Sequence, residues 1–128
     1  VLQVSSIGAY QPCPTYASYG AAKSFVLHHG EALDFELRPK GVTVTVISPG
    51  VTATEFLEVS GQEPTMYQRM MMMDSPTVAR VGVDAALAGK RHVIPGVLNW
   101  LAAFSVRFVP RRVAVWMAWM SMRPDAVA

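Results

Sequence analysis

Two short apolar runs separated by a helical pattern constrain the fold of this chain most strongly. The runs VLQVSS (1–6) and GVTVTVIS (41–48) are rich in β-branched residues and end in polar or turn residues, as buried strands do. Residues 15–37 between them have a helical spacing of small and apolar residues, and Arg38-Pro39 ends the pattern because the residue before a proline resists the α conformation. The expected buried positions of this helix are Ala22, Val26, Gly30, Leu33 and Leu37.

The remainder of the chain continues the alternation of strands and helices. Residues 51–74, rich in Thr, Glu and Met, predict a flap with one or two short helices; residues 75–89 predict a helix with Ser75 as N-cap and Pro76 in its first turn. A short strand, RHVIPG, and two apolar helical pieces, 97–109 and 113–122, follow. Alternating strands and helices predict an α/β fold with a parallel sheet, resembling one half of a doubly wound domain.

Composition excludes several classes of function. The 128 residues suffice for one small domain, and a single cysteine cannot form a disulfide framework. Residues 1–89 hold five Lys/Arg against eight Asp/Glu, whereas residues 90–128 hold six against one, so the acidic body offers no basic stripe for nucleic acid. His28 and His29 have no third ligand at metal spacing, and we expect no metal site.

The segment YASYGAAK (16–23) places a lysine four residues after one of its two tyrosines. Residues i and i+4 share a face of a helix, so Lys23 is expected beside Tyr19, whereas Tyr16 is followed at that spacing by Gly20. A nearby ammonium favours the charged form of a phenol, whose ordinary pKa of about 10 is too high for proton exchange at neutral pH. The spacing therefore makes Tyr19 a candidate acid–base.

The surroundings of this segment strengthen a motif that is weak on its own. Both predicted strands end near it, one in Ser5-Ser6 and the other in Pro49-Gly50. Ligands of open α/β sheets bind beyond the carboxyl ends of the strands. We therefore expect serine, tyrosine and lysine to converge there.

The segments SSIGAY, YGAAK and ISPGVTATEF together resemble the short-chain dehydrogenase/reductase family, from its catalytic strand to its C-terminus, and hydroxysteroid-dehydrogenase-like bacterial members in particular. The resemblance implies the C-terminal half of a Rossmann-type fold and an NAD- or NADP-dependent oxidoreductase that interconverts a carbonyl and an alcohol by hydride transfer. It selects Ser6 over Ser5 as the substrate-binding serine, because the family's serine lies thirteen residues before the tyrosine. Tyr19 would exchange the proton, and Lys23 would hold the nicotinamide ribose.

The resemblance also implies contacts to cofactor and substrate. The cofactor's carboxamide would meet the segment after the second strand, at Pro49, Gly50, Thr52 and Thr54. The family usually has an aliphatic residue in place of Thr52, a departure that a main-chain contact tolerates. The substrate pocket would be lined by Ser6, Tyr10, Tyr16 and Phe56. An apolar lining favours an apolar carbonyl or alcohol of small to medium size.

The family pattern is only half represented in these residues. No Gly-rich turn for the pyrophosphate and no acidic or basic residue that selects NAD or NADP precedes the first strand. The segments expected are the catalytic strand and helix (1–38), the strand and Pro-Gly loop (41–54), the flap (51–74) and a helix–strand–helix unit (75–122). We expect a C-terminal piece that is inactive alone and that forms a homo-oligomer when full-length.

Other classes of function stay open at this point. Three tryptophans and several arginines lie within or beside 97–122, so this segment suits either peripheral contact with a membrane or packing at a subunit interface. The rival function is a non-catalytic interaction or membrane-docking module that keeps the fold. A second rival, an epimerase or dehydratase with a similar Tyr/Lys pair, would need a longer C-terminal domain. We expect a cytoplasmic protein with possible membrane association.

Overall fold

A computed structural model describes residues 1–53 and 64–122, and all structural statements refer to these residues. The strands are β1 (Leu2–Val4), β2 (Thr45–Ile47), β3 (Thr52–Ala53), β4 (Met73–Asp74) and β5 (His92–Val93). The α-helices are α1 (Ala17–Leu37), α3 (Met66–Met71), α4 (Ser75–Leu87), α5 (Val97–Ser105) and α6 (Arg111–Met122). Short 3₁₀ helices are η1 (Ile7–Tyr10), η2 (Arg38–Lys40) and η3 (Val106–Phe108).

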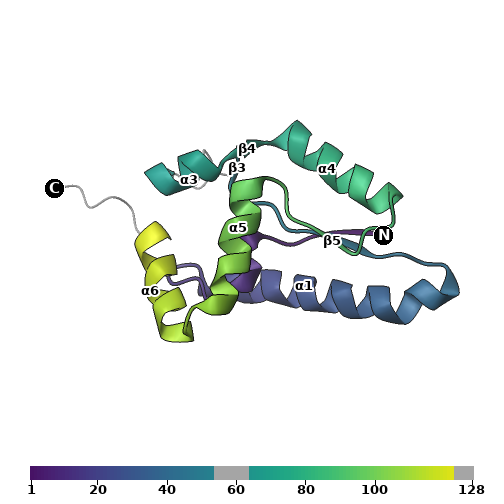
Figure 1. Ribbon diagram of the computed structural model, residues 1–128, viewed down its shortest axis with the longest axis horizontal. Helices are drawn as coiled ribbons and strands as arrows, with labels where there is room; N and C mark the ends of the chain where they lie inside the picture. Colours follow the sequence, from purple (N-terminus) through teal and green to yellow (C-terminus); the bar gives the residue numbers. More distant parts are fainter. Residues whose placement is uncertain (54–63, 123–128) are drawn as a thin grey trace.

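Strands β1, β2 and β5 form a parallel sheet in that order, with Val4 opposite Ile47 and Ile47 opposite Val93. Figure 1 shows α1 along one side of this sheet and α4 along the other. Successive residues of the central strand β2 point to opposite faces, so Val46 meets α1 and Ile47 meets α4. This layering confirms the predicted α/β fold with a parallel sheet.

Helix α1 comes unusually close to the sheet at Gly30. A Cβ atom on Gly30 would lie 2.4 Å from Val46 Cγ2 and 2.5 Å from Gln3 Oε1, so only glycine permits this approach. The buried residues of the helix are Gly20, Leu27, Gly30 and Asp34. Of the buried face predicted from the sequence, Gly30 is buried but Ala22 is exposed, because two glycines and a paired aspartate mark the packed face better than apolar character does.

An ion cluster joins the end of α1 to both neighbouring strands. The fully buried Asp34 carboxylate accepts hydrogen bonds from Arg38 of η2 (2.8 and 3.0 Å), Arg91 beside β5 (2.8 Å) and the Val44 amide (2.9 Å). Burial opposes ionisation, but the bonds from Arg91, Val44 and Arg38 outweigh it and hold the Asp34 pKa at about 2. This carboxylate therefore fixes the helix–strand turn that carries the chain into β2.

Several boundaries differ from those predicted. Helix α4 is capped by Asp74 rather than Ser75: the Asp74 carboxylate accepts from the Thr77 amide (2.9 Å), and Ser75 is the first helical residue. The expected strand over 41–48 is regular only at Thr45–Ile47. The flap contains a short helix, α3, with a Thr65–Gln68 capping box, and its strand β4 pairs with β3. The part of the flap at 54–63 lies outside the described residues.

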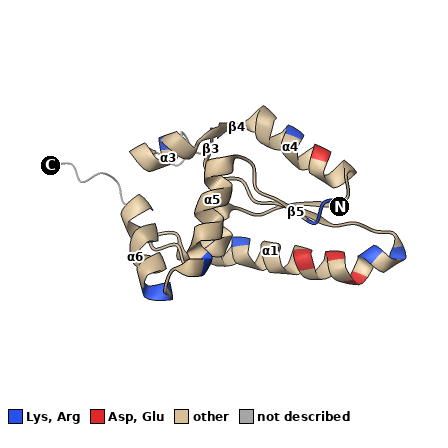
Figure 2. Cartoon of the chain, viewed as in Figure 1, with Lys and Arg blue, Asp and Glu red and all other residues tan. Residues whose placement is uncertain are grey.

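Helices α5 and α6 lie beyond the carboxyl ends of the strands (Figure 1). Helix α5 has no charged residue, and the arginines of this region lie in the connecting η3 (Arg107) and at the start of α6 (Arg111 and Arg112). Figure 2 shows basic residues between the two helices and most of both helices uncharged. Among the described residues, no helix is both long enough and apolar enough to cross a membrane.

Candidate active site

Ser6 is positioned at the carboxyl end of β1 by the turn into η1. Its Oγ accepts a hydrogen bond from the Gly8 amide (3.1 Å) and thereby caps the 3₁₀ helix. The Ile7 amide next to it donates to the Pro49 carbonyl (2.9 Å), which joins this turn to the loop after β2. The neighbouring Ser5 instead donates its hydroxyl proton to the Lys23 carbonyl (2.8 Å). The two serines therefore have different tasks, and only Ser6 keeps its O–H for another acceptor.

Tyr19 and Lys23 lie one turn apart near the start of α1. A Cβ placed on Gly8 would be 3.6 Å from Ser6 Oγ and 3.7 Å from Tyr19 Cε1, so both side chains converge on the open side of this glycine. The Lys23 ammonium lies 5.8 Å from the centre of the Tyr19 ring and donates to the Val4 carbonyl (3.1 Å). Tyr19 is 45% exposed, so an incoming ligand can reach its ring and hydroxyl.

Cys13 holds η1 against α1 and so brings Ser6 to Tyr19. Its Sγ donates to the Gly8 carbonyl (3.3 Å), and a Cβ on Gly20 would come within 3.0 Å of the Cys13 Cβ. Burial raises the pKa of the Cys13 thiol, which keeps it protonated at neutral pH. We therefore assign Cys13 a packing role.

The Pro49-Gly50 loop adjoins Ser6 on the other side. Pro49 is buried, Gly50 is half-buried, and Thr52 Oγ1 donates to the Gly50 carbonyl (3.3 Å). Thr54 and Phe56, expected at the cofactor and the substrate, lie outside the described residues.

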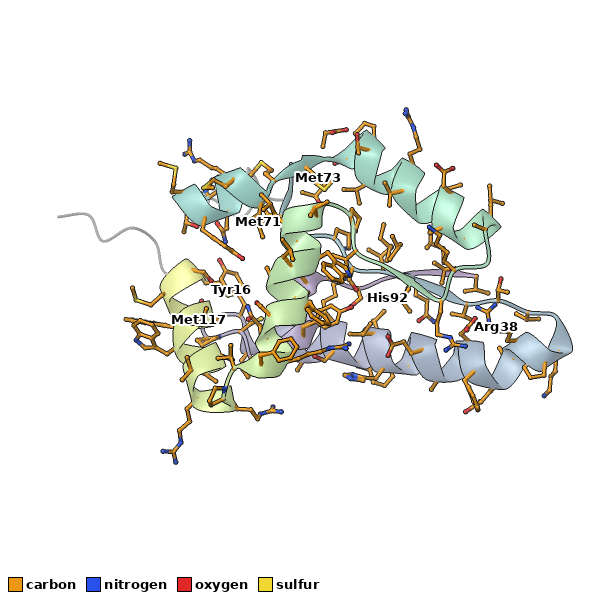
Figure 3. The ribbon with its side chains drawn as sticks, in the orientation of Figure 1. Tyr16, Arg38, Met71, Met73, His92 and Met117 are labelled. Carbon is orange, nitrogen blue, oxygen red and sulfur yellow. The ribbon has the colours of Figure 1, made fainter. Side chains whose placement is uncertain are left out.

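Tyr10 and Tyr16, the other substrate candidates, both precede α1: Tyr10 ends η1, and Tyr16 is the N-cap of α1. The Tyr10 hydroxyl is hydrogen-bonded to His92 Nε2 (2.5 Å), which also meets Ser48 Oγ (3.3 Å). Burial raises the Tyr10 pKa and lowers the His92 pKa, so both rings are neutral near pH 7. Tyr16 is half-buried in the N-cap position of α1 (Figure 3).

Two cavities flank the site without including its central residues. One of about 130 Å³ lies between η1, α5 and α6, and one of about 730 Å³ lies between η1, α1 and η3. Tyr10 and Cys13 line the larger cavity; Ser6, Tyr19 and Lys23 line neither. Of the three central residues, Ser6 is buried, Lys23 is half-buried and Tyr19 is exposed.

Comparison with known proteins identifies the family to which the chain belongs. The model of the family described as short chain dehydrogenase matches residues 1–65, which include Ser6, Tyr19, Lys23 and the Pro49-Gly50 loop. This chain belongs to the short-chain dehydrogenase family.

Individual members of the family agree with this assignment. The 17-beta-hydroxysteroid dehydrogenase type 3 of Rattus norvegicus is 37% identical over 77% of this chain and 33% of its own length. Two solved short-chain dehydrogenases are similar in structure. One, from a study of 7beta-hydroxysteroid dehydrogenase stereoselectivity, has a TM-score of 0.73 at 25% identity over 92% of this chain. The other, from Sphingobium yanoikuyae in complex with NADPH, has a TM-score of 0.63 at 24% identity over 99%.

These matches cover only part of each relative's length. The chain spans about a third of the length of the curated short-chain dehydrogenases it matches and 46% of each of the two solved chains. The matches bear out the predicted family and Rossmann-type fold.

Sequence reasoning missed three residues with supporting contacts in this short-chain dehydrogenase: His92 and Asn99, which border the site, and Asp34, which lies near the far end of α1. Asp34 could have been found from its i,i+4 spacing to Arg38. His92 contacts Tyr10 across 82 residues, and nothing in the local sequence signals that contact. Asn99 is the amide residue of the otherwise mostly apolar helix α5 and is 2% exposed. A polar residue among apolar neighbours was the sequence signal that could have found it.

Proposed function

We propose that this chain carries the acid–base centre of an NAD(P)-dependent oxidoreductase that interconverts a carbonyl and an alcohol. The observation that supports this most is the convergence of Ser6 and Tyr19 over Gly8, with the Lys23 ammonium beside the tyrosine ring. Family membership supports oxidoreductase chemistry. Because the chain spans less than half of its solved neighbours, the activity is proposed for the whole protein.

The residues divide the proton chemistry between them. Ser6 Oγ accepts from the Gly8 amide, so its own O–H is available to hydrogen-bond the substrate's oxygen. Tyr19 donates its proton to that oxygen during reduction and takes it back during oxidation. The Lys23 ammonium stabilises the negative charge left on the Tyr19 oxygen. The bound nicotinamide would supply the hydride.

The exposed part of the site fits a nicotinamide cofactor. Tyr19 and Lys23 would contact the ribose, while Pro49, Gly50 and Thr52, followed by Thr54, would meet the carboxamide. The Thr52 hydroxyl supports this assignment because its present bond to the Gly50 carbonyl is long (3.3 Å), so the hydroxyl can exchange it for a bond to the carboxamide. The printed title of one neighbour names NADPH. The proposal covers NAD and NADP alike.

The proposed substrate is an apolar carbonyl or alcohol. Two relatives carry hydroxysteroid dehydrogenase in their names, which makes a steroid-sized ketone a reasonable member of a test panel. Tyr16 and Phe56 are the proposed apolar contacts. Tyr10 is a weaker candidate, because its hydroxyl is occupied by His92.

The test is a hydride-transfer assay on the native protein, with NADH and NADPH against apolar ketones and aldehydes. Ser6→Ala and Ser5→Ala form a matched pair that removes neighbouring hydroxyls. We expect Ser6→Ala to lower kcat/KM by about 10²-fold, on the scale of losing one donor to the reacting oxygen. Ser5→Ala should lower stability and leave the chemistry largely intact, because its hydroxyl bonds the Lys23 carbonyl. No turnover of any carbonyl with either nucleotide would contradict the proposal.

The alternative function, docking to a membrane or another apolar surface, is favoured by one observation. Helices α5 and α6 expose Trp100, Phe104 and Trp116. Trp100 stacks on Phe104, and the Arg107 guanidinium lies 5.6 Å from the centre of the Phe104 ring. No acidic residue occurs in either helix. Exposed aromatic residues beside arginines suit a surface of anionic lipid. Co-sedimentation of the native protein with phosphatidylserine vesicles, compared with phosphatidylcholine vesicles, tests this alternative.

Self-association is proposed for the native protein from the outer face of α1. Phe25 (68% exposed) stacks on His29 of the same helix, and Phe35 is 74% exposed. Large apolar residues along one helix are typical of a subunit interface. Sedimentation of Phe25→Ser/Phe35→Ser against the wild type would reveal whether this face holds two copies together.

A further inference from the structure

A single buried asparagine connects three segments that border the proposed site. Asn99 lies in the first turn of α5 and is 2% exposed. Its Nδ2 donates to the Pro95 carbonyl (3.0 Å), to the Met71 carbonyl (3.4 Å) and, more weakly, toward Met73 Sδ (3.8 Å). Figure 3 shows Met71 and Met73 beside the end of α5 at which the helix begins. The amide nitrogen therefore ties α5 to the end of the flap.

The amide oxygen of Asn99 has no hydrogen-bond partner among the described residues, although it is buried. Its orientation is fixed by the nitrogen, because exchanging the two atoms would turn Oδ1 toward the Pro95 and Met71 carbonyls, which cannot donate. A buried acceptor without a donor is unfavourable, so an apolar residue would serve packing better. Its presence indicates a role other than filling space.

The Asn99 amide group packs against Gly50, with its unpartnered oxygen nearest. A Cβ on Gly50 would lie 2.3 Å from Oδ1, 2.6 Å from Cγ and 2.7 Å from Nδ2, so the two residues are in direct contact and only glycine fits. The same loop is joined to the serine turn by the Ile7–Pro49 bond (2.9 Å) and to β4 by the bond from the Met73 amide to the Val51 carbonyl (3.1 Å). Asn99 therefore sits behind the loop, between it and the flap.

We propose that Asn99 is a positioning residue that sets the Pro49-Gly50 loop at the distance the nicotinamide requires. It acts through Gly50, holding the loop from behind while its nitrogen holds the flap. This inference rests on the proposed function for the identity of the cofactor, but the contact between Asn99 and Gly50 does not. Asn99 does not touch the reacting atoms, but we expect that its substitution weakens cofactor binding.

The test uses the native protein, with NAD(P)H dissociation constants measured from fluorescence without substrate and kcat measured at saturating cofactor. Asn99→Leu keeps the branching at Cγ and the number of heavy atoms and removes both polar atoms. We expect cofactor affinity to fall on the order of tenfold, the scale of one lost positioning contact, while kcat changes less than about twofold. Ser105→Ala, which removes a hydroxyl bonded only within α5, is the control and should change neither value. Unchanged cofactor affinity in Asn99→Leu would overturn the inference.

A double-mutant cycle tests the contact itself. Gly50→Ala places a methyl group against Asn99, and Asn99→Ala removes all three side-chain atoms that this methyl group would meet. We expect Gly50→Ala to lower the urea midpoint and cofactor affinity in the wild type and to do so far less in the Asn99→Ala background. Equal effects in both backgrounds would overturn the Asn99 inference alone. A wild type that binds neither nucleotide would contradict the proposed function and the cofactor role of Asn99. The urea midpoints of the double-mutant cycle would then still measure the contact between Asn99 and Gly50.

Discussion

The Asp34 ion cluster gives the sharpest prediction about how this fold is held together. Asp34→Asn keeps an oxygen for the Val44 amide but removes the charge that attracts Arg38 and Arg91. Hydrogen bonds to charged groups contribute about 1.5–3 kcal/mol each when desolvated. The two arginine side chains are 38% and 53% exposed, so solvent screens part of this, and we take about 1 kcal/mol per arginine. The free energy of unfolding should fall by about 2 kcal/mol at pH 7.

The pH dependence of this loss distinguishes charge from packing. The pKa of Asp34 is about 2 in the folded protein, below its ordinary value of 3.8. A carboxyl whose pKa is lowered by folding stabilises the folded state above its unfolded pKa, and this stability disappears as the pH falls through the folded value. The gap between the wild type and Asp34→Asn should therefore be constant at neutral pH and narrow between about pH 4 and pH 2.

Urea unfolding followed by circular dichroism at pH 7, 4 and 2.5 would measure this gap. Asp84→Asn, an exposed aspartate on α4, is the matched control and should stay within about 0.5 kcal/mol of the wild type. A variant as stable as the wild type at pH 7 would refute the reasoning. So would a deficit that is equally large at pH 2.5, since it would show that shape rather than charge is responsible.

Three further substitutions test the packing of the fold. Gly30→Ala should destabilise the protein by more than about 2 kcal/mol, because its Cβ would meet Val46 at 2.4 Å. Gly82→Ala should be near neutral, because the one close contact of its Cβ is with the tip of the Ile47 side chain at 2.9 Å and Leu2 is 3.5 Å away; thermal unfolding compares the two variants. Thr15 has a φ of 70° before α1, so Thr15→Gly should stabilise by about 1 kcal/mol, and a lower urea midpoint would argue against strain there. The buried Cys13 thiol, with its raised pKa, should react with a disulfide reagent at neutral pH only as fast as the protein opens; rapid labelling of the folded protein would contradict its packing role.

The sequence was sufficient to predict the layered fold because its local signals agree with one another. The β-branched run at 41–48, Pro39 after the helix and the alternation of strands with helices all favour one parallel sheet. The helix face was predicted less well. Its packed positions are glycines and a charged residue, and a spacing of apolar residues cannot reveal that Asp34 is buried because distant Arg91 neutralises it.

The central site residues could be identified because their chemistry depends on short spacings. Tyr19 and Lys23 share a helix face, and Ser6 ends a strand, so the sequence was enough to nominate all three. The supporting contacts depend on tertiary structure instead. Tyr10 meets His92 and Gly50 meets Asn99 only because α5 and β5 return to the carboxyl edge of the sheet, and neither pairing leaves a trace in the spacing of the chain.

The central claim is that Tyr19 exchanges the proton, and one measurement tests it most directly. Hydride transfer by Tyr19→Phe should be followed in the native protein beside Tyr16→Phe, which removes the hydroxyl that has no lysine at the following turn. The account predicts that Tyr19→Phe lowers kcat by about 10²-fold or more with cofactor affinity preserved, while Tyr16→Phe affects at most the KM of the substrate. A Tyr19→Phe protein that retains wild-type kcat would contradict the account.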